Sequence, residues 1–182
     1  MTIDIKDIKQ NHYTESGFKQ FDPVFGDHTK NVCEALEKKG WDNGAIKKQL
    51  GKALEIMSFS NPSNAPRGQS TQGLVMGRVQ SGKTTSFSMV SSLAADNGYK
   101  IIIQLLGTTN LLVDDNFKDV KKVLGLDGDN NLDWWYPLQV GAKGAGPNGV
   151  EYQTNEIVRA IGNKKGQLNQ NRTSKILYIY CI

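Results

Sequence analysis

One short segment constrains the fold of this chain more than any other feature of its sequence. The segment reads Gly77, Arg78, Val79, Gln80, Ser81, Gly82, Lys83 and Thr84, and it matches the pattern G-x-x-x-x-G-K-[ST] at every required position. A short apolar run, residues 73–76, precedes it, and an amphipathic stretch follows it. The pattern in this context predicts a buried strand, a phosphate-binding loop and a helix, in that order.

Each required position of the loop has a physical reason. Gly77 allows a tight turn out of the strand because it has no Cβ, and Gly82 lets the backbone close on a phosphate. Successive backbone N–H groups of residues 79–83 form an anion-binding nest, to which the helix N-terminus adds its dipole. The ammonium group of Lys83 is expected to reach the β- and γ-phosphates, and the hydroxyl of Thr84 to ligate magnesium.

The sequence therefore predicts a site for ATP and Mg²⁺. The predicted nucleotide-binding residues are Gly77, Arg78, Val79, Gln80, Ser81, Gly82, Lys83, Thr84 and Thr85. Of these, Lys83 is the predicted catalytic residue that stabilises phosphoryl charge, and Thr84 the catalytic metal ligand. The alternative, a glycine-rich surface turn, is disfavoured because an apolar run precedes the loop and an amphipathic stretch follows it.

The segment before the loop is predicted to be helical. Apolar residues recur at helical spacing at Ile46, Leu50, Leu54 and Met57, and a shorter helix is expected over residues 31–39, ending at Gly40. Residues 60–68 are rich in Pro, Asn, Ser and Gly, which is typical of a loop. We therefore predict a helical N-terminal region, residues 1–66, followed by a phosphate-loop lobe, residues 67–182.

Strands and helices are expected to alternate in the lobe, which favours an α/β fold with a parallel sheet. Buried strands are predicted at 73–76, 99–106 and 175–182, and helices at 83–96, from about 110 to 124, and at 155–161. The expected helix faces carry Phe87, Val90 and Ala94, then Val113, Phe117, Val120 and Leu124, with Gly98 and Gly125 as terminators.

Hydrolysis requires a carboxylate at the end of a neighbouring strand, which helps to hold magnesium. The one apolar run that ends in acids, residues 111–115 with Asp114 and Asp115, has a spacing that continues into a helix, so we favour a helix start there. The strand at 175–182 stops before any acid. The lobe is therefore expected to be incomplete at its C-terminus, and a non-hydrolysing, nucleotide-binding interaction module stays open.

Composition excludes some classes of protein. The 182 residues are 38% hydrophobic and 22% charged, which is typical of a globular chain. The net charge of +4 is compatible with a polyanionic partner.

The N-terminus of the chain is charged, and no apolar stretch approaches the ~20 residues of a membrane span. We expect a cytoplasmic protein with reduced cysteines and no membrane partner. An unrelated small kinase or GTPase is the alternative enzyme. Residues 163–166 lack the final Asp of a guanine-reading motif, which weakens a GTPase, and we find no arginine-rich lid that would favour a kinase.

Residues 73–112 carry a resemblance to a known family. The loop reads Gly-x-Val-Gln-Ser-Gly-Lys-Thr, followed by Ala-Asp-x-Gly-Tyr and by an apolar strand that ends in Gly-Thr-x-Asn-x-Leu. This combination resembles the Z-one domain family of endonucleases. Gln80 and the pair Gly98 and Tyr99 make the likeness more specific than a phosphate loop alone.

The resemblance implies a superfamily-two helicase-type ATPase with RecA-like lobes, from a bacterial restriction or phage-defence system. This chain would be its N-terminal portion, a DNA-directed ATP hydrolase lobe whose partners are DNA and a second ATPase lobe or nuclease subunit. Residues 107–110 would then touch the DNA backbone, although a plain helix cap explains Thr and Asn there equally well. The family's Arg and Gln after this turn are replaced here by residues 113–116, Val-Asp-Asp-Asn.

Overall fold

The computed structural model describes residues 19–75, 82–105, 118–125, 135–140 and 176–181. The chain divides into two compact units, Met1–Tyr99 and Lys100–Ile182, and each is described by itself. None of the helices in the described part is long and apolar enough to cross a membrane.

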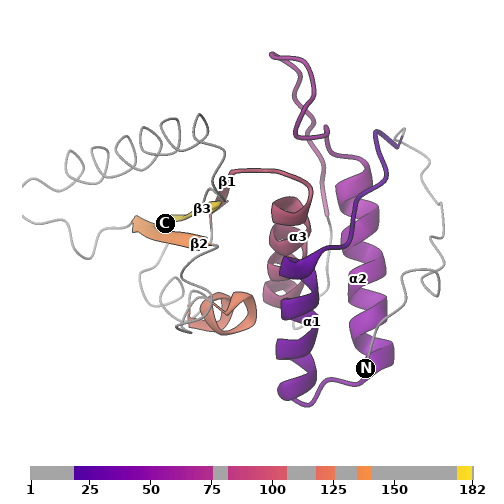
Figure 1. The fold of residues 1–182 in the computed structure, drawn as a ribbon, viewed down its shortest axis with the longest axis vertical. Helices are drawn as coiled ribbons and strands as arrows, with labels where there is room; N and C mark the ends of the chain where they lie inside the picture. The colour runs from indigo at the N-terminus through magenta and orange to yellow at the C-terminus, as the bar shows by residue number, and fades with distance from the viewer. Residues whose placement is uncertain (1–18, 76–81, 106–117, 126–134, 141–175, 182) are drawn as a thin grey trace, which may run out of the picture. The chain divides into compact units, whose positions relative to one another are not determined.

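Within its described residues, the first unit contains three helices that lie side by side, α1 (Asp27–Lys38), α2 (Asn43–Ser58) and α3 (Lys83–Asp96) (Figure 1). Helix α3 packs against both α1 and α2. Their shared core consists of Val32, Cys33, Leu36, Ile46, Leu50, Ala53, Leu54, Met57, Met89 and Leu93. The predicted stripe of α2 is thus confirmed. Helix α3, which follows the phosphate loop, packs against α1 and α2, which belong to the predicted N-terminal region. The division of the chain into residues 1–66 and 67–182 stays a prediction.

A tight turn makes α1 and α2 a hairpin. Gly40 has a φ of 85°, which confirms it as the residue that ends α1. The N–H of Trp41 donates to the carbonyl of Leu36 over 3.1 Å, a bond that closes the helix end and fixes the backbone of Trp41. The carboxylate of Asp42 then accepts from the N–H of Ala45 at 2.9 Å and caps α2.

The N-terminus of α1 is capped from another helix. Its own N-cap residue is Gly26, which has no side chain to offer. Instead the carboxylate of Asp96, at the end of α3, accepts hydrogen bonds from the backbone N–H groups of Gly26, His28 and Thr29, each at 3.0 Å. It also accepts from the hydroxyl of Thr29 at 2.6 Å. An anion at this position complements the positive end of the α1 dipole.

The residues around Asp96 bind further parts of the chain. The side-chain amide of Asn97 accepts from the N–H of Val24 at 2.7 Å and donates to its carbonyl at 2.9 Å. The hydroxyl of Ser63 donates to the carbonyl of Asn97 at 2.7 Å, and the hydroxyl of Tyr99 donates to the carbonyl of Asn61. Residues 96–99 therefore hold in place, by hydrogen bonds, both the residues that precede α1 and the loop that follows α2.

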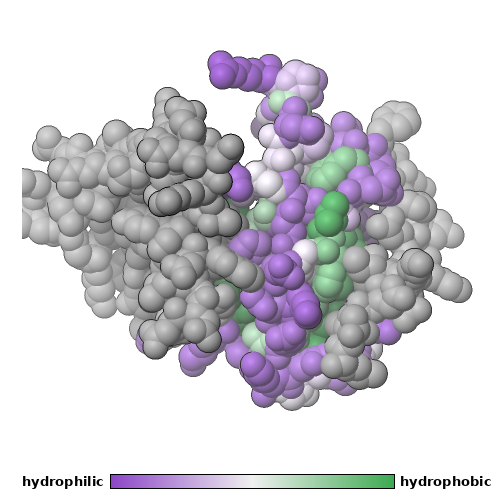
Figure 2. Space-filling view, in the orientation of Figure 1, coloured by the Kyte–Doolittle hydropathy of each residue, from purple (hydrophilic) through white to green (hydrophobic). Residues whose placement is uncertain are grey.

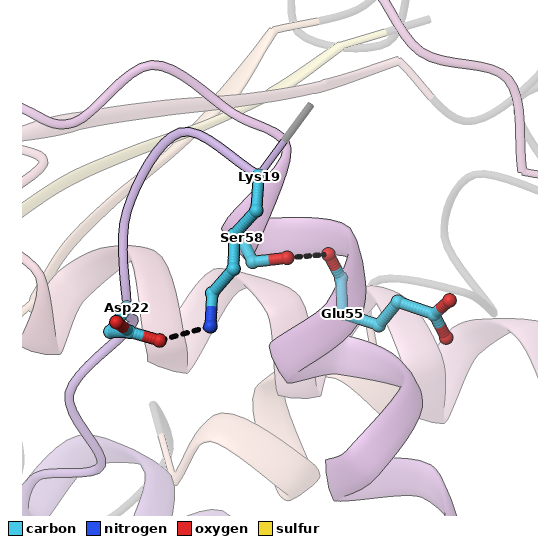
Figure 3. A network of polar contacts seen from close by, with 4 residues as sticks. All are labelled: Lys19, Asp22, Glu55 and Ser58. Atoms are coloured by element: carbon cyan, nitrogen blue, oxygen red, sulfur yellow. Dashed lines mark hydrogen bonds and ion pairs between the residues drawn. The ribbon is translucent and has the colours of Figure 1, made fainter. Parts of the chain in front are cut away.

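The chain before α1 passes the C-terminal end of α2 (Figure 3). The N–H of Gln20 donates to the carbonyl of Ser58 at 2.7 Å, and the hydroxyl of Ser58 donates to the carbonyl of Glu55 at 2.7 Å. Lys19 and Asp22 form an ion pair in the same place. The Asp22 side chain is largely exposed, so the pair contributes little, and the backbone bond holds the segment.

The face of this unit that Figure 2 shows is mostly hydrophilic. Figure 2 shows a strip of hydrophobic residues among hydrophilic ones in the region of α1 and α2. Most apolar side chains of α1 and α2 are nevertheless buried, as the amphipathic spacing of α2 predicts.

The described part of the second unit contains three parallel strands, β1 (Ile101–Leu105), β2 (Trp135–Val140) and β3 (Ile176–Cys181), in the order β1-β3-β2. Ile103 of β1 and Leu138 of β2 both pair with Ile179 of β3. Pro137 lies in β2, at an edge of this sheet, where a missing N–H is tolerated. Residues 118–124 form a helix, which ends at Gly125 with a φ of 69°.

Several predicted elements are confirmed in the described residues. The helix at 83–96 has the predicted bounds, and it is followed by Gly98 with a φ of 85°. The strands predicted at 99–106 and 175–182 are present as β1 and β3, and Val120 and Leu124 are buried as expected. The strand β2 was not predicted. The helix at 155–161, together with Val113 and Phe117, lies outside the described residues.

The predicted buried strand at 73–76 is wrong for the described residues 73–75. They form no strand, and Leu74 and Val75 are 86% and 61% exposed. A short apolar run carries no periodicity, and a strand needs a hydrogen-bonding neighbour that the run itself does not supply. The prediction that β1 is a buried strand is also wrong for one of its faces, because Ile101, Ile103 and Leu105 are exposed.

The predicted buried face of α3 is wrong in part. Phe87 is 45% exposed, whereas Thr85, Ser88, Ser91 and Ser92 are buried. Hydroxyl groups can be buried there because they donate to the helix itself, as Ser88 does to the carbonyl of Thr84 at 3.0 Å. Small hydroxyl side chains also let α3 pack closely against α1 and α2. A search for regularly spaced apolar residues does not detect such small polar residues at a helix interface.

Candidate functional site

The structure describes one end of the predicted phosphate loop. Gly82, Lys83, Thr84 and Thr85 lie within the described residues. The other predicted binding residues, Gly77, Arg78, Val79, Gln80 and Ser81, lie outside them, as do residues 107–110 and the acids Asp114 and Asp115.

Gly82 has the backbone conformation that explains the glycine of the motif. Its φ of 72° and ψ of 34° lie in the left-handed region, where a side chain is strained. The next residue, Lys83, begins α3, and the carbonyl of Gly82 accepts from the N–H of Ser86 at 3.0 Å. The chain therefore turns sharply at Gly82 and enters the helix at once.

The N-terminus of α3 suits an anion. A glycine N-cap offers no side-chain oxygen to the first N–H groups, and the first turn contains no acid. The N-terminal end of a helix carries a partial positive charge that stabilises phosphate. This end therefore contrasts with the N-terminus of α1, where the carboxylate of Asp96 takes the position of the anion.

The two threonines of the motif differ in burial. Thr84 is half-buried, whereas Thr85 is 9% exposed, which places its side chain in the helix core. The predicted role of Thr85 in nucleotide binding therefore rests on its backbone N–H. Thr84 is the threonine whose hydroxyl suits a metal ligand.

Two side chains from the α1–α2 hairpin lie beside Gly82. A Cβ atom placed on Gly82 would lie 3.5 Å from Nε2 of Gln49 and 3.5 Å from the indole ring of Trp41. The Oε1 atom of Gln49 accepts a hydrogen bond from the hydroxyl of Ser86 at 3.1 Å. Sequence reasoning missed these residues, because nothing in the sequence relates a glutamine and a tryptophan of the hairpin to the loop.

The described residues contain no group of three or more His, Cys, Asp and Glu side chains that could hold a metal ion. The predicted magnesium ligand, Thr84, lies in this part of the chain.

Cys33 is buried between the helices at 3% exposure. Burial, and secondarily the nearby carboxylates of Glu37 and Glu34, raise the pKa of its thiol from 9.0 to about 12. Such a thiol is inert, so we assign Cys33 to packing and not to chemistry.

Comparison with known proteins identifies no relative. No protein-family model matches this chain, and searches of the curated proteins and of the solved structures found no match. The likeness to the Z-one domain family therefore rests on the motifs in residues 73–112 and stays a prediction.

Proposed function

We propose that this chain binds ATP with magnesium through residues 77–84. The observation that carries the proposal is the left-handed Gly82 directly before the first residue of α3, within a sequence that matches the phosphate-loop pattern at every position. A loop of this kind needs a glycine at this turn for its backbone, and here the glycine adopts a left-handed conformation in which other residues are strained.

The roles of the residues follow from their places in the loop. Backbone N–H groups of residues 79–83 and the positive end of α3 hold the phosphates, and Lys83 balances their charge. Thr84 contributes the hydroxyl that holds magnesium, and the ion, when bound, neutralises charge on the β- and γ-phosphates. The acid-free first turn of α3 avoids repulsion of the same phosphates.

We further propose that the nucleotide site belongs to a helicase-like, DNA-directed ATPase of the restriction or phage-defence type. The support is the resemblance of residues 73–112, together with three parallel strands that follow α3 in the chain. Parallel strands alternating with helices are the architecture in which phosphate loops occur. The net charge of +4 is compatible with a DNA partner.

Titration calorimetry with Mg-ATP tests the first part. We compare the wild-type chain with Lys83→Ala and with Lys52→Ala, a matched loss of one exposed lysine on α2. We expect Lys83→Ala to weaken binding at least a hundredfold and Lys52→Ala to leave it unchanged. Equal affinities in all three proteins would refute the assignment of the loop.

Turnover of ATP with and without DNA tests the second part. Stimulation by DNA in the wild-type chain, abolished by Lys83→Ala, supports the DNA-directed ATPase. Binding without turnover under either condition favours the non-hydrolysing interaction module instead.

A further inference from the structure

Asn97, which directly follows the last residue of α3, holds the segment before α1 with its side-chain amide. Its Oδ1 atom accepts from the N–H of Val24 at 2.7 Å, and its Nδ2 atom donates to the carbonyl of Val24 at 2.9 Å. The same Nδ2 atom donates to the carbonyl of Leu93, in the last turn of α3, at 2.7 Å. These bonds use the oxygen and both protons of the amide, so a carboxylate at this position cannot make the same set.

The residue that follows makes this amide chemically reactive. Gly98 comes next in the chain, and an asparagine before a glycine loses its amide readily, because glycine has no Cβ to hinder attack by its backbone nitrogen. The nitrogen of Gly98 bonds to Cγ of Asn97, the Cγ–Nδ2 bond breaks, and the proton of the Gly98 N–H leaves with Nδ2 as ammonia. Water then opens the resulting succinimide at either of its carbonyls, which gives aspartate or isoaspartate.

The folded unit opposes this reaction. The N–H of Gly98 donates to the carbonyl of Ala95 at 3.1 Å, which holds the attacking nitrogen at the helix end. The amide of Asn97 is held by its bonds to Val24 and Leu93. Ring closure has to break both sets of bonds. Because Val24 belongs to the segment before α1, the reaction requires a local opening in which this segment leaves α3.

The same fold requires the reactive pair. Gly98 has a φ of 85°, in the left-handed region, and a Cβ on it would lie 2.8 Å from Oγ of Ser63. Any other residue would be strained and crowded there. Asn97 in turn is needed for its bonds to the backbone of Val24. The end of α3 therefore combines an asparagine and a glycine for structural reasons, and their chemical reactivity comes with them.

We propose that Asn97 is a site of spontaneous deamidation, suppressed while the segment before α1 is bound, and that the modification releases this segment irreversibly. A carboxylate accepts hydrogen bonds and donates none, so the carbonyls of Val24 and Leu93 lose their donor and face a negative charge. The charge is also added beside Asp96, at the C-terminal end of α3, where an anion is unfavourable. A brief opening is thereby converted into a lasting one.

Mass spectrometry of the wild-type chain measures the reaction without any substitution. The chain is incubated at mildly alkaline pH, in buffer and in urea, and then digested with trypsin, which releases Asn97 in residues 84–100 and Asn43 in residues 40–47. Asn43 is also followed by a glycine, so the two asparagines should react at similar rates in urea. We expect Asn97 to react at least about tenfold more slowly in the folded chain than in urea. Equal rates in both conditions, or no reaction of Asn97 in urea while Asn43 reacts, would overturn the proposal.

Substitutions of Val24 test whether the segment before α1 controls the rate. Val24→Pro removes the N–H that Asn97 accepts, so we expect a severalfold faster reaction of Asn97 in buffer and an unchanged rate in urea. Val24→Ala is the matched control, because it keeps the backbone groups and shortens a side chain that is 62% exposed. If circular dichroism shows that Val24→Pro does not fold, Asp96→Ala takes its place, since it releases Gly26 of the same segment. Wild-type rates of Asn97 in the folded variants would refute control by this segment.

Hydrogen exchange tests the consequence of the modification. Asn97→Asp has the side chain of one reaction product, and we expect faster amide exchange in residues 19–29 than in the wild-type chain. Asn43→Asp makes the same chemical change in the first turn of α2, where an acid is favourable, and should leave the exchange of residues 19–29 unchanged. If Asn97→Asp exchanges as slowly as the wild-type chain there, the segment is not released and the proposal is wrong.

Discussion

Asp96→Ala is expected to cost the first unit a large part of its stability. The carboxylate of Asp96 accepts three backbone N–H groups and the hydroxyl of Thr29, whose side chain is completely buried. A helix N-cap is worth about 0.5–2 kcal/mol, and buried donors left without a partner cost about 1–3 kcal/mol. Because the N–H and the hydroxyl of Thr29 lose their shared acceptor at once, we expect a decrease of roughly 2–4 kcal/mol in the free energy of unfolding.

Urea denaturation followed by far-UV circular dichroism measures this decrease. The matched control is Asp42→Ala, which removes an exposed aspartate cap with a single bond, to the N–H of Ala45, and is expected to cost about 1 kcal/mol. Asp96→Asn should fall between the two, because it keeps one acceptor oxygen and loses the charge. A loss no greater than that of Asp42→Ala would refute the reasoning.

Further outcomes are expected for Gly26, Cys33 and Tyr99 of the same unit. Gly26→Ala places a Cβ 2.6 Å from the carboxylate of Asp96, so we expect a loss of about 1–3 kcal/mol in urea denaturation. The loss should be smaller in the Asp96→Ala background, where only the Cβ of residue 96, at 3.2 Å, remains close. The pKa of the Cys33 thiol is raised to about 12, so alkylation of Cys33 at pH 8 should be about a thousandfold slower in the folded chain than in the chain unfolded in urea; the rates are measured in a variant without the other cysteine. Because this pKa lies above the unfolded value of 9.0, the free energy of unfolding should also fall as the pH rises from 9.0 towards 12. Tyr99→Phe removes the bond to the carbonyl of Asn61 and is expected to lower the unfolding free energy by about 1 kcal/mol; an unchanged midpoint would contradict this.

Local periodicity was sufficient to predict α2 and the end of α1, whereas the start of α1 was predicted at residue 31 and lies at Asp27. The spacing of Ile46, Leu50, Leu54 and Met57 identifies the buried side of α2, and all four are buried. Glycines that follow a periodic segment end it, as Gly40 does with its positive φ. These features depend on residues close together in the chain, so a pattern of a few residues contains them.

Long-range features could not be predicted in this way. The residue that caps α1 is Asp96, which lies 67 residues beyond Thr29, and a local pattern would seek the cap near Gly26. The strand predicted at 73–76 depended on apolar character alone, although Leu74 is 86% exposed. Of the candidate site, the motif predicts Gly82 and its helix, whereas Trp41 and Gln49 reach it through packing of α2 on α3.

Helix α3 is hydrogen-bonded to the α1–α2 hairpin at both of its ends, and loss of the bonds at one end should affect nucleotide binding differently from loss at the other. Gln49 lies at the end that carries the loop, so its loss changes the site directly. Asp96 lies at the opposite end of α3, and its loss changes the ratio of folded to unfolded chains. A domain with a typical unfolding free energy of about 5–15 kcal/mol remains mostly folded after a loss of roughly 3 kcal/mol. Asp96→Ala should therefore bind Mg-ATP with unchanged affinity, and ATP at about a hundred times its Kd should restore about 2.7 kcal/mol of stability, close to what the substitution removed.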